Sequence, residues 1–196
     1  MKKAFLPLLS KNTGKERLGM LTSAAKKDII FSDNYPDLED KMERIQSFCV
    51  DHDYITEGIY ISRIDGDITT FDMRTRVPNM GDYMDNLTMH SVEHMFATYI
   101  RNSEIGDRVI YFGPMGCRTG FYLLTRDVEP SLAVEQILAV LDKIAYHSDK
   151  MFGAERKECG NYRELSLQAA QREAARYLSI LRGKEIDLKY PTEEGI

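Results

Sequence analysis

Two histidines, His90 and His94, stand four residues apart, and Glu93 directly precedes the second. On a helix, positions i and i+4 lie on one face, so both imidazole rings could bind one metal ion. Glu93 would then lie close enough to transfer protons beside that ion. The segment predicts half of a metal site, because two nitrogens alone do not hold a metal. The alternative is two hydrogen-bonded helix residues and a solvated surface acid.

Residues that could complete such a site lie downstream. The order His-x-x-Glu-His is the signature of inverted zincin proteases, whose third ligand is a later carboxylate; Glu158, Glu164 and Glu173 are the candidates. Cys117 and Cys159, each in a turn-like segment, offer thiolates instead. One bound cysteine would leave a position open for water or substrate. Two bound cysteines would close the site as a structural centre.

The composition is that of a globular chain. It has 196 residues, of which 43% are hydrophobic and 29% charged, and its three widely spaced cysteines argue for reduced thiols over a disulfide framework. The net charge of -5 argues against a general nucleic-acid binder, although the first 28 residues carry seven Lys or Arg against two acids. Residues 5–9 form a short apolar run broken by Pro7, so we expect a retained N-terminus, no membrane span and a cytoplasmic location.

The chain divides into two parts at about residue 40. Residues 1–40 mix polar, basic and turn-forming residues without a clear period, which predicts a partly ordered N-terminal extension. Residues 41–196 are expected to form a single catalytic, metal-binding domain. Cys49 lies near its start and is assigned no role.

The elements that must position the reactive residues follow from the hydrophobic pattern. Residues 58–64 and 68–74 flank an Asp-Gly-Asp turn and predict a hairpin, and residues 109–112 and 120–124 predict two further strands. Helices are expected over residues 86–102, 131–147 and 166–181. Cys117 would lie in the bend between the later strands, and Cys159 in a loop over 153–163. The order predicts an α+β fold with a mainly antiparallel sheet and helices packed on one face.

Three motifs in series make the interpretation specific. The order His-Ser-Val-Glu-His (90–94), Pro-Met-Gly-Cys-Arg-Thr-Gly-Phe-Tyr (114–122) and Cys-Gly-Asn-Tyr-Arg (159–163) resembles the LuxS family of S-ribosylhomocysteine lyases. Upstream, residues 47–52 are similar to the family's Ser-Phe-x-x-Asp-His segment, and residues 71–74 to its Phe-Asp-x-Arg strand. The resemblance implies a LuxS/metallopeptidase-like fold. The chain departs from the family at residues 111–113, Tyr-Phe-Gly, where an acidic residue is common.

The resemblance also implies a site. It calls for one divalent metal per subunit, with Fe(II) as the physiological ion and Zn(II) or Co(II) able to use the same ligands. It further implies a homodimer with active sites at the interface, where residues 47–52 reach the other subunit's metal. The residues so assigned are, as metal ligands, His90, His94 and Cys159; as the acid–base pair, Cys117 and Glu93; and as substrate-binding residues, Ser47, His52 and Arg74.

The reaction implied by the family is cleavage of S-ribosylhomocysteine to homocysteine and 4,5-dihydroxy-2,3-pentanedione, the precursor of autoinducer-2. A thioether is a poor leaving group on an unactivated carbon, so the carbonyl must migrate along the sugar until β-elimination becomes accessible. An open metal and an acid–base pair meet that requirement. The alternatives are an inverted zincin metallopeptidase and a zinc-stabilised interaction module without enzymatic activity.

Overall fold

The computed structural model describes residues 43–193, so the predicted extension over residues 1–40 lies outside the described part. The elements match those predicted, with ends that differ by a few residues. They are β1 (Gly58–Asp65), β2 (Ile68–Arg74), α1 (Asn86–Arg101), β3 (Val109–Pro114), β4 (Gly120–Arg126), α2 (Pro130–Ala145) and α3 (Leu167–Arg182), with 3-10 turns at η2 (Gln46–Phe48) and η3 (Gly106–Arg108).

The four strands form one sheet in the order β1-β2-β4-β3, and every neighbouring pair is antiparallel. β2 and β4 stay in register to the end of β2, where Arg74 pairs with Gly120. A Cβ atom at Gly120 would lie only 2.6 Å from the carbonyl oxygen of Met73, so glycine permits this close pairing. The pairing brings Arg74 next to the bend that carries Cys117.

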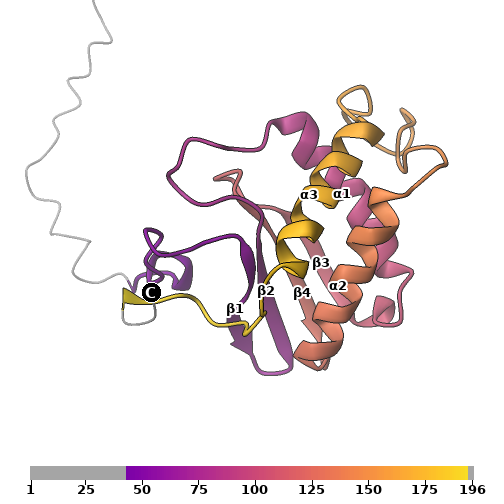
Figure 1. The fold of residues 1–196 in the computed structure, drawn as a ribbon. Helices are drawn as coiled ribbons and strands as arrows, with labels where there is room; N and C mark the ends of the chain where they lie inside the picture. The colour runs from indigo at the N-terminus through magenta and orange to yellow at the C-terminus, as the bar shows by residue number, and fades with distance from the viewer. Residues whose placement is uncertain (1–42, 194–196) are drawn as a thin grey trace, which may run out of the picture. The chain divides into compact units, whose positions relative to one another are not determined.

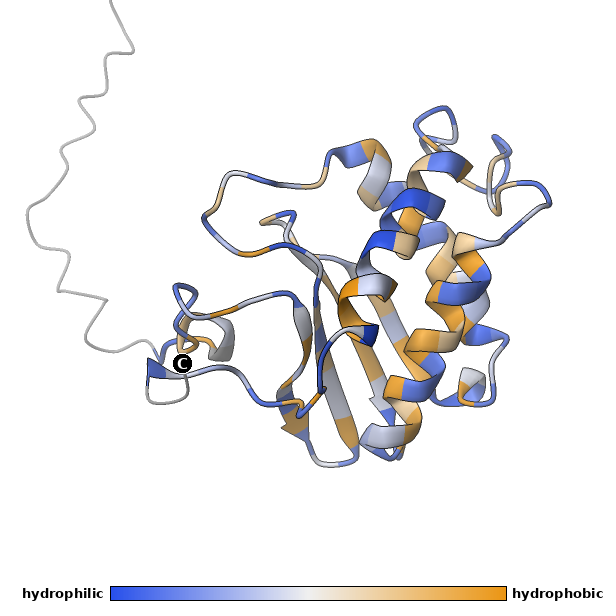
Figure 2. Ribbon diagram, viewed as in Figure 1, coloured by the Kyte–Doolittle hydropathy of each residue, from blue (hydrophilic) through white to orange (hydrophobic). Residues whose placement is uncertain are grey.

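All three helices lie on one face of the sheet, as the sequence predicts (Figure 1). The side chains of Phe71, Met73, Phe121 and Leu123 point toward them and are almost completely buried. Figure 2 shows hydrophobic residues concentrated between the helices and the sheet. The hydrophobic core between the two layers therefore fixes where the helices sit.

The buried face of α1 decides where its histidines point. Asp85 caps the start of the helix by accepting a hydrogen bond from the backbone N–H of Thr88. Val92, Met95 and Phe96 lie in the core, and this stripe fixes the rotation of the helix. His90 and His94 consequently lie half-buried at its margin, on one side.

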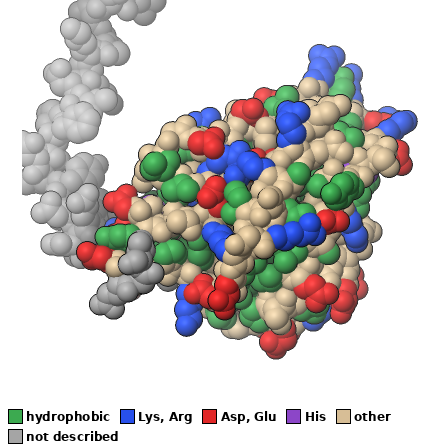
Figure 3. Space-filling view, viewed as in Figure 1, with side chains coloured by type: hydrophobic (Ala, Val, Ile, Leu, Met, Phe, Trp, Pro, Cys, Tyr) green, Lys and Arg blue, Asp and Glu red, His purple; other side chains and the backbone are tan. Residues whose placement is uncertain are grey.

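α2 ends at Ala145, whereas the pattern predicts a helix to residue 147. Tyr146 is the C-terminal cap, and the His147 ring makes its hydrogen bonds outside the helix, to Tyr99 and to the backbone of Lys150. Among residues 43–193, no helix combines the length and apolarity needed to cross a membrane. On the face in Figure 3, acidic and basic side chains are interspersed with apolar ones.

Candidate active site

The structure brings His90, His94 and Cys159 together. Their ligand atoms all lie within 4.8 Å of one another, and Cys159 Sγ is 3.3 Å from His90 Nε2. In a tetrahedral site with metal–nitrogen and metal–sulfur distances of about 2.0 and 2.3 Å, nitrogen and sulfur lie about 3.5 Å apart. The three groups therefore fit one divalent cation, with both imidazoles and a loop thiolate as its donors.

Both histidines are oriented by their second ring nitrogen. His90 Nδ1 is 3.0 Å from the carbonyl oxygen of Glu164, and His94 Nδ1 is 3.1 Å from that of Phe152. A carbonyl can only accept, so each Nδ1 carries a hydrogen, and in the neutral ring Nε2 is then the nitrogen that presents a lone pair. The tautomer that a metal ligand needs is thus set in both rings by the backbone.

These two bonds also close the loop that carries Cys159. Phe152 precedes the loop and Glu164 follows it, so the α1 histidines hold both of its ends. Gly153 adopts a φ of +66°, and a Cβ atom there would overlap the His94 ring at Nδ1. Within the loop, the backbone N–H of Asn161 lies 3.3 Å from the Cys159 sulfur and donates to it.

Neither alternative ligand set forms. In the described part of the chain, the cluster contains no carboxylate and does not include Cys117. The Glu164 side chain accepts from Asn161, and Glu173 is paired with two arginines. The carboxylate ligand of an inverted zincin and the closed two-cysteine centre thus have no counterpart here.

Cys117 lies in the tight turn between β3 and β4. The backbone N–H of Met115 donates to the carbonyl of Gly120, and the carbonyl of Met115 accepts from the N–H of Arg118. Arg118 adopts a φ of +62° in this turn. The Cys117 side chain is exposed, and its sulfur lies 3.0 Å from Thr119 Oγ1 and 3.9 Å from Arg74 Nη1. Arg74 Nη1 also donates to Thr119 Oγ1 over 2.6 Å, which leaves the threonine hydrogen free to point at the sulfur.

Arg74 is buried beneath this turn, with only 3% of its surface exposed. Asp72 pairs with it at 2.5 Å and accepts a further hydrogen bond from Tyr190. Burial alone would lower the pKa of Arg74, but the charge and hydrogen bonds of Asp72 outweigh it and the pKa is raised. The guanidinium is therefore a fixed positive charge near Cys117.

The chain is similar to known proteins over most of its length. The family model for S-ribosylhomocysteinase (LuxS) matches residues 45–186. An S-ribosylhomocysteine lyase of Borreliella burgdorferi (strain ZS7) is 43% identical over 157 residues, which cover 76% of this chain and 100% of that protein. The lyase of Clostridium beijerinckii is 40% identical over 158 residues, covering 76% and 99% respectively. That of Phocaeicola vulgatus is 40% identical over 161 residues, covering 78% and 100%. The chain belongs to the LuxS family.

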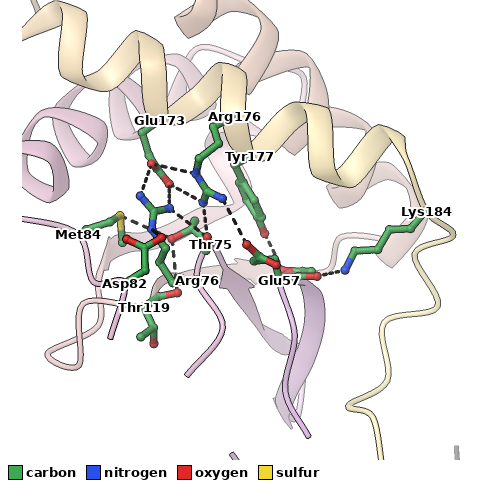
Figure 4. A network of polar contacts seen from close by, with 11 residues as sticks. Glu57, Thr75, Arg76, Asp82, Met84, Thr119, Glu173, Arg176, Tyr177 and Lys184 are labelled. Carbon is green, nitrogen blue, oxygen red and sulfur yellow. Dashed lines mark hydrogen bonds and ion pairs between the residues drawn. The ribbon is translucent and has the colours of Figure 1, made fainter. Parts of the chain in front are cut away.

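Within this LuxS chain, a network of charges secures the end of β2 behind the thiol turn (Figure 4). Arg76 forms a double hydrogen bond with Glu173 of α3, at 2.6 and 2.7 Å. Arg176 bonds the same carboxylate and the carbonyl oxygen of Thr75. The backbone N–H groups of Thr75 and Arg76 both donate to Thr119. The network is thus connected to the turn of Cys117 by the backbone of Thr75 and Arg76, just beyond β2.

The pKa of Glu173 reflects these partners. Its side chain is 6% exposed, and burial alone would raise its pKa. Hydrogen bonds and charges from Arg76 and Arg176 outweigh burial, so the net pKa is lowered. Asp82 lies 3.2 Å from Arg76 Nε as an ion pair, outside hydrogen-bond geometry, and Glu57 pairs with Arg176. Glu173 is therefore held as a carboxylate by its surroundings.

The remaining residues that the sequence assigns are less engaged. Glu93 is half-buried on α1, next to His94 in sequence. Ser47 lies in η2, and His52 bonds the backbone of Val50. Within residues 43–193, no hydrogen bond joins Ser47 or His52 to the histidine–cysteine cluster or to Cys117.

Sequence reasoning missed several groups that support the site. Thr119 lies inside a quoted motif, so its nearness to Cys117 could have been noticed. The carbonyl groups of Phe152 and Glu164 have no side-chain signature, because any residue could supply them. Gly153 follows Met151 and Phe152 in the sequence, and its contact with His94 becomes visible only in the fold.

Proposed function

We propose that this chain cleaves S-ribosylhomocysteine to homocysteine and 4,5-dihydroxy-2,3-pentanedione, the precursor of autoinducer-2. The observation that carries the proposal is the different surroundings of two thiols. Cys159 lies against His90 in the candidate metal cluster, whereas Cys117 stands outside that cluster beside Thr119 and Arg74. One thiol is placed to bind a cation, and the other is left free for proton transfer.

His90, His94 and Cys159 would hold one divalent ion, proposed to be Fe(II), with Zn(II) or Co(II) able to use the same ligands. When bound, such an ion supplies Lewis-acid stabilisation for negative charge on the sugar oxygens. Three protein ligands leave a coordination position for the substrate. The Nδ1 hydrogen bonds to the carbonyl groups of Glu164 and Phe152 would keep both rings oriented with Nε2 toward the ion.

Cys117 serves as the base that removes protons as the carbonyl migrates along the sugar. Arg74 donates to the oxygen of Thr119, so the threonine hydroxyl can donate to the sulfur. Glu93, adjacent to His94 on α1, transfers protons in the later enolisation and in the elimination. Elimination then expels the homocysteine thiolate from the carbon next to the activated one.

We further propose a cytoplasmic homodimer in which Ser47 and His52 complete the substrate site of the partner subunit. One observation supports this: the apolar side chains of Ile45, just before η2, and Phe48, in η2, are 57% and 65% exposed. Exposed apolar groups of this size favour burial against another surface. Arg74 would contribute to the substrate site from beneath Cys117.

The decisive test is release of free thiol from S-ribosylhomocysteine by the purified, metal-loaded chain. Cys117→Ala should keep the metal and the fold but lower turnover about 100- to 10,000-fold, the range expected for loss of an acid–base residue. Thr98→Ala, on the same helix as the histidines but outside the cluster, is the control and should retain turnover. A folded, metal-loaded parent that releases no thiol would reject the proposal.

A further inference from the structure

A second group of side chains lies behind His94, away from the candidate ligand atoms. Tyr99 of α1 and His147, just beyond α2, approach each other with the tyrosine hydroxyl 2.6 Å from His147 Nδ1. The Phe152 ring packs edge-on against both, with centroid distances of 5.3 Å to Tyr99 and 5.0 Å to His147. These three side chains, named here the aromatic clamp, enclose the start of the loop that bears Cys159.

The hydrogen bonds of the clamp have one consistent direction. His147 Nε2 is 2.9 Å from the carbonyl oxygen of Lys150, which can only accept, so Nε2 carries the hydrogen. His147 Nδ1 is then the acceptor for the Tyr99 hydroxyl. Gln171 of α3 donates to the His147 carbonyl over 2.7 Å. All three helices thus hold the turn over residues 147–152.

This turn supplies the group that orients His94. The carbonyl of Phe152 accepts from His94 Nδ1, and Gly153 lies directly against the same ring. If Phe152 moved away, His94 would lose its acceptor and with it the preference for a lone pair on Nε2. Movement toward the ring would bring Gly153 into overlap. The position of the turn therefore controls both the tautomer and the orientation of His94.

The other histidine is held independently of the clamp. Its acceptor, the carbonyl of Glu164, lies two residues before Ser166, whose backbone N–H donates to Ser91 of α1. Ser166 is also the N-terminal cap of α3. A defect in the aromatic clamp should consequently affect His94 and leave the environment of His90 unchanged.

We propose that Tyr99 and His147 are positioning residues that act through Phe152 and Gly153 to hold His94 ready for a metal ion. This inference rests on the proposed function only in that it takes His94 to be a metal ligand. Groups that orient a ligating histidine change metal affinity about 10- to 100-fold when removed. We expect the loss of metal affinity in Tyr99→Phe to lie in that range. The substitution removes a single hydroxyl and keeps the ring that packs on Phe152.

The test uses Co(II) as the probe, with the full-length chain freed of metal. Absorption bands of thiolate-bound Co(II) report binding at Cys159, and competition with a chelator gives the dissociation constant. We expect Tyr99→Phe and His147→Leu to raise that constant about 10- to 100-fold. Tyr146→Phe is the matched control, because Tyr146 is 80% exposed beside His147, and it should leave the constant unchanged.

The nitrogen-15 NMR signals of His94 and the melting temperature of the metal-free chain complete the test. The parent should show a slowly exchanging Nδ1–H on His94 that Tyr99→Phe loses, with the His90 signal retained. An unchanged Co(II) dissociation constant in Tyr99→Phe would overturn the inference, whatever the melting temperature does. If affinity and melting temperature both fall, loss of the His94 Nδ1–H signal supports the inference and its retention overturns it. A parent that binds no Co(II) through a thiolate would instead contradict the metal site of the proposed function.

Discussion

The two thiols of the site stand on supports of opposite character. Around Cys159, the ordering interactions are neutral: two imidazoles donate to backbone carbonyls, and a backbone N–H donates to the sulfur. Around Cys117, the ordering interactions are between charges. Asp72 pairs with Arg74 directly beneath the turn, and Glu173 pairs with Arg76, just beyond β2, and with Arg176 of α3.

The difference suits the role proposed for each thiol. A histidine ligand needs a defined tautomer, and a backbone carbonyl that accepts from Nδ1 selects it without adding a charged group beside the metal site. A thiolate base needs positive charge or donors nearby, and a buried guanidinium needs a counter-ion. Asp72 meets that need for Arg74, at the cost of burying a second charge. The backbone acceptors around Cys159 can therefore be supplied by a loop. The charged groups around Cys117 come from the sheet and from α3.

The largest effect should come from replacing each of the two cysteines separately and measuring the metal content of both variants. Cys159→Ala removes one of three ligands, and we expect metal affinity to fall well over 100-fold, beyond the loss from removing a group that only orients a ligand. Cys117→Ala should retain its metal, because its sulfur lies outside the cluster. Metal content after dialysis measures both. Loss of metal in both variants would show that both thiols bind, which would remove the contrast between them.

The next largest effect should be a loss of stability on replacing Glu173, with no change in metal binding at His90, His94 and Cys159. Glu173→Leu removes the buried carboxylate that Arg76 bonds and leaves that largely buried guanidinium with only the exposed Asp82, so the free energy of unfolding should fall by about 3–5 kcal/mol in urea titrations of the metal-free chain. Combining it with Arg76→Met removes both charges and should restore most of that loss.

The matched control for this prediction is Arg182→Leu. Its ion pair with Asp142 has side chains 59% and 42% exposed, so removing it should change stability by less than about 1 kcal/mol. An equal loss in Glu173→Leu and Arg182→Leu would mean that the network behind Cys117 contributes no more than a surface pair.

Local features of the fold and the site could be predicted from the sequence, whereas features that depend on long-range contacts could not. The hairpin, the four strands and the α1 histidines follow from alternation, an Asp-Gly turn and i, i+4 spacing, all of which are local. Glu173 was one of three candidate metal ligands, yet it faces two arginines, and one of them, Arg76 just beyond β2, is 97 residues away in the sequence. Charge type alone does not reveal which buried cation an acid will meet. The choice of Cys159 over a carboxylate likewise came from the family motifs, since the loop's position depends on backbone acceptors.

A smaller effect is expected at Gly153, where backbone and metal ligand meet. Gly153→Ala combines strain at a φ of +66° with overlap at His94 Nδ1, so metal affinity should fall about 10- to 100-fold. Gly66→Ala is the control: its φ is +61°, but a Cβ atom there meets nothing within 4 Å. Gly66→Ala should destabilise the hairpin by about 1 kcal/mol and leave Co(II) affinity unchanged. Equal Co(II) affinity in Gly153→Ala and Gly66→Ala would show that the backbone at Gly153 does not influence metal binding.

The smallest effect is a dependence on acid that belongs to the charged groups around Cys117. The pKa of Glu173 is lowered in the folded chain by Arg76 and Arg176, whose other neighbours are Asp82 and Glu57. The carboxylate therefore contributes stability that is fully present above the unfolded glutamate pKa of about 4.3 and is lost as pH falls through the lower folded value. The advantage of the parent over Glu173→Gln in the free energy of unfolding, measured by urea titration, should be constant near neutral pH and shrink below about pH 4.3, by at most about 1.4 kcal/mol per pH unit. The measurement uses metal-free protein, so proton competition at the metal ligands does not enter. An advantage that stayed constant down to pH 3 would mean that hydrogen-bond geometry, and not the charge of Glu173, holds the strand end behind Cys117.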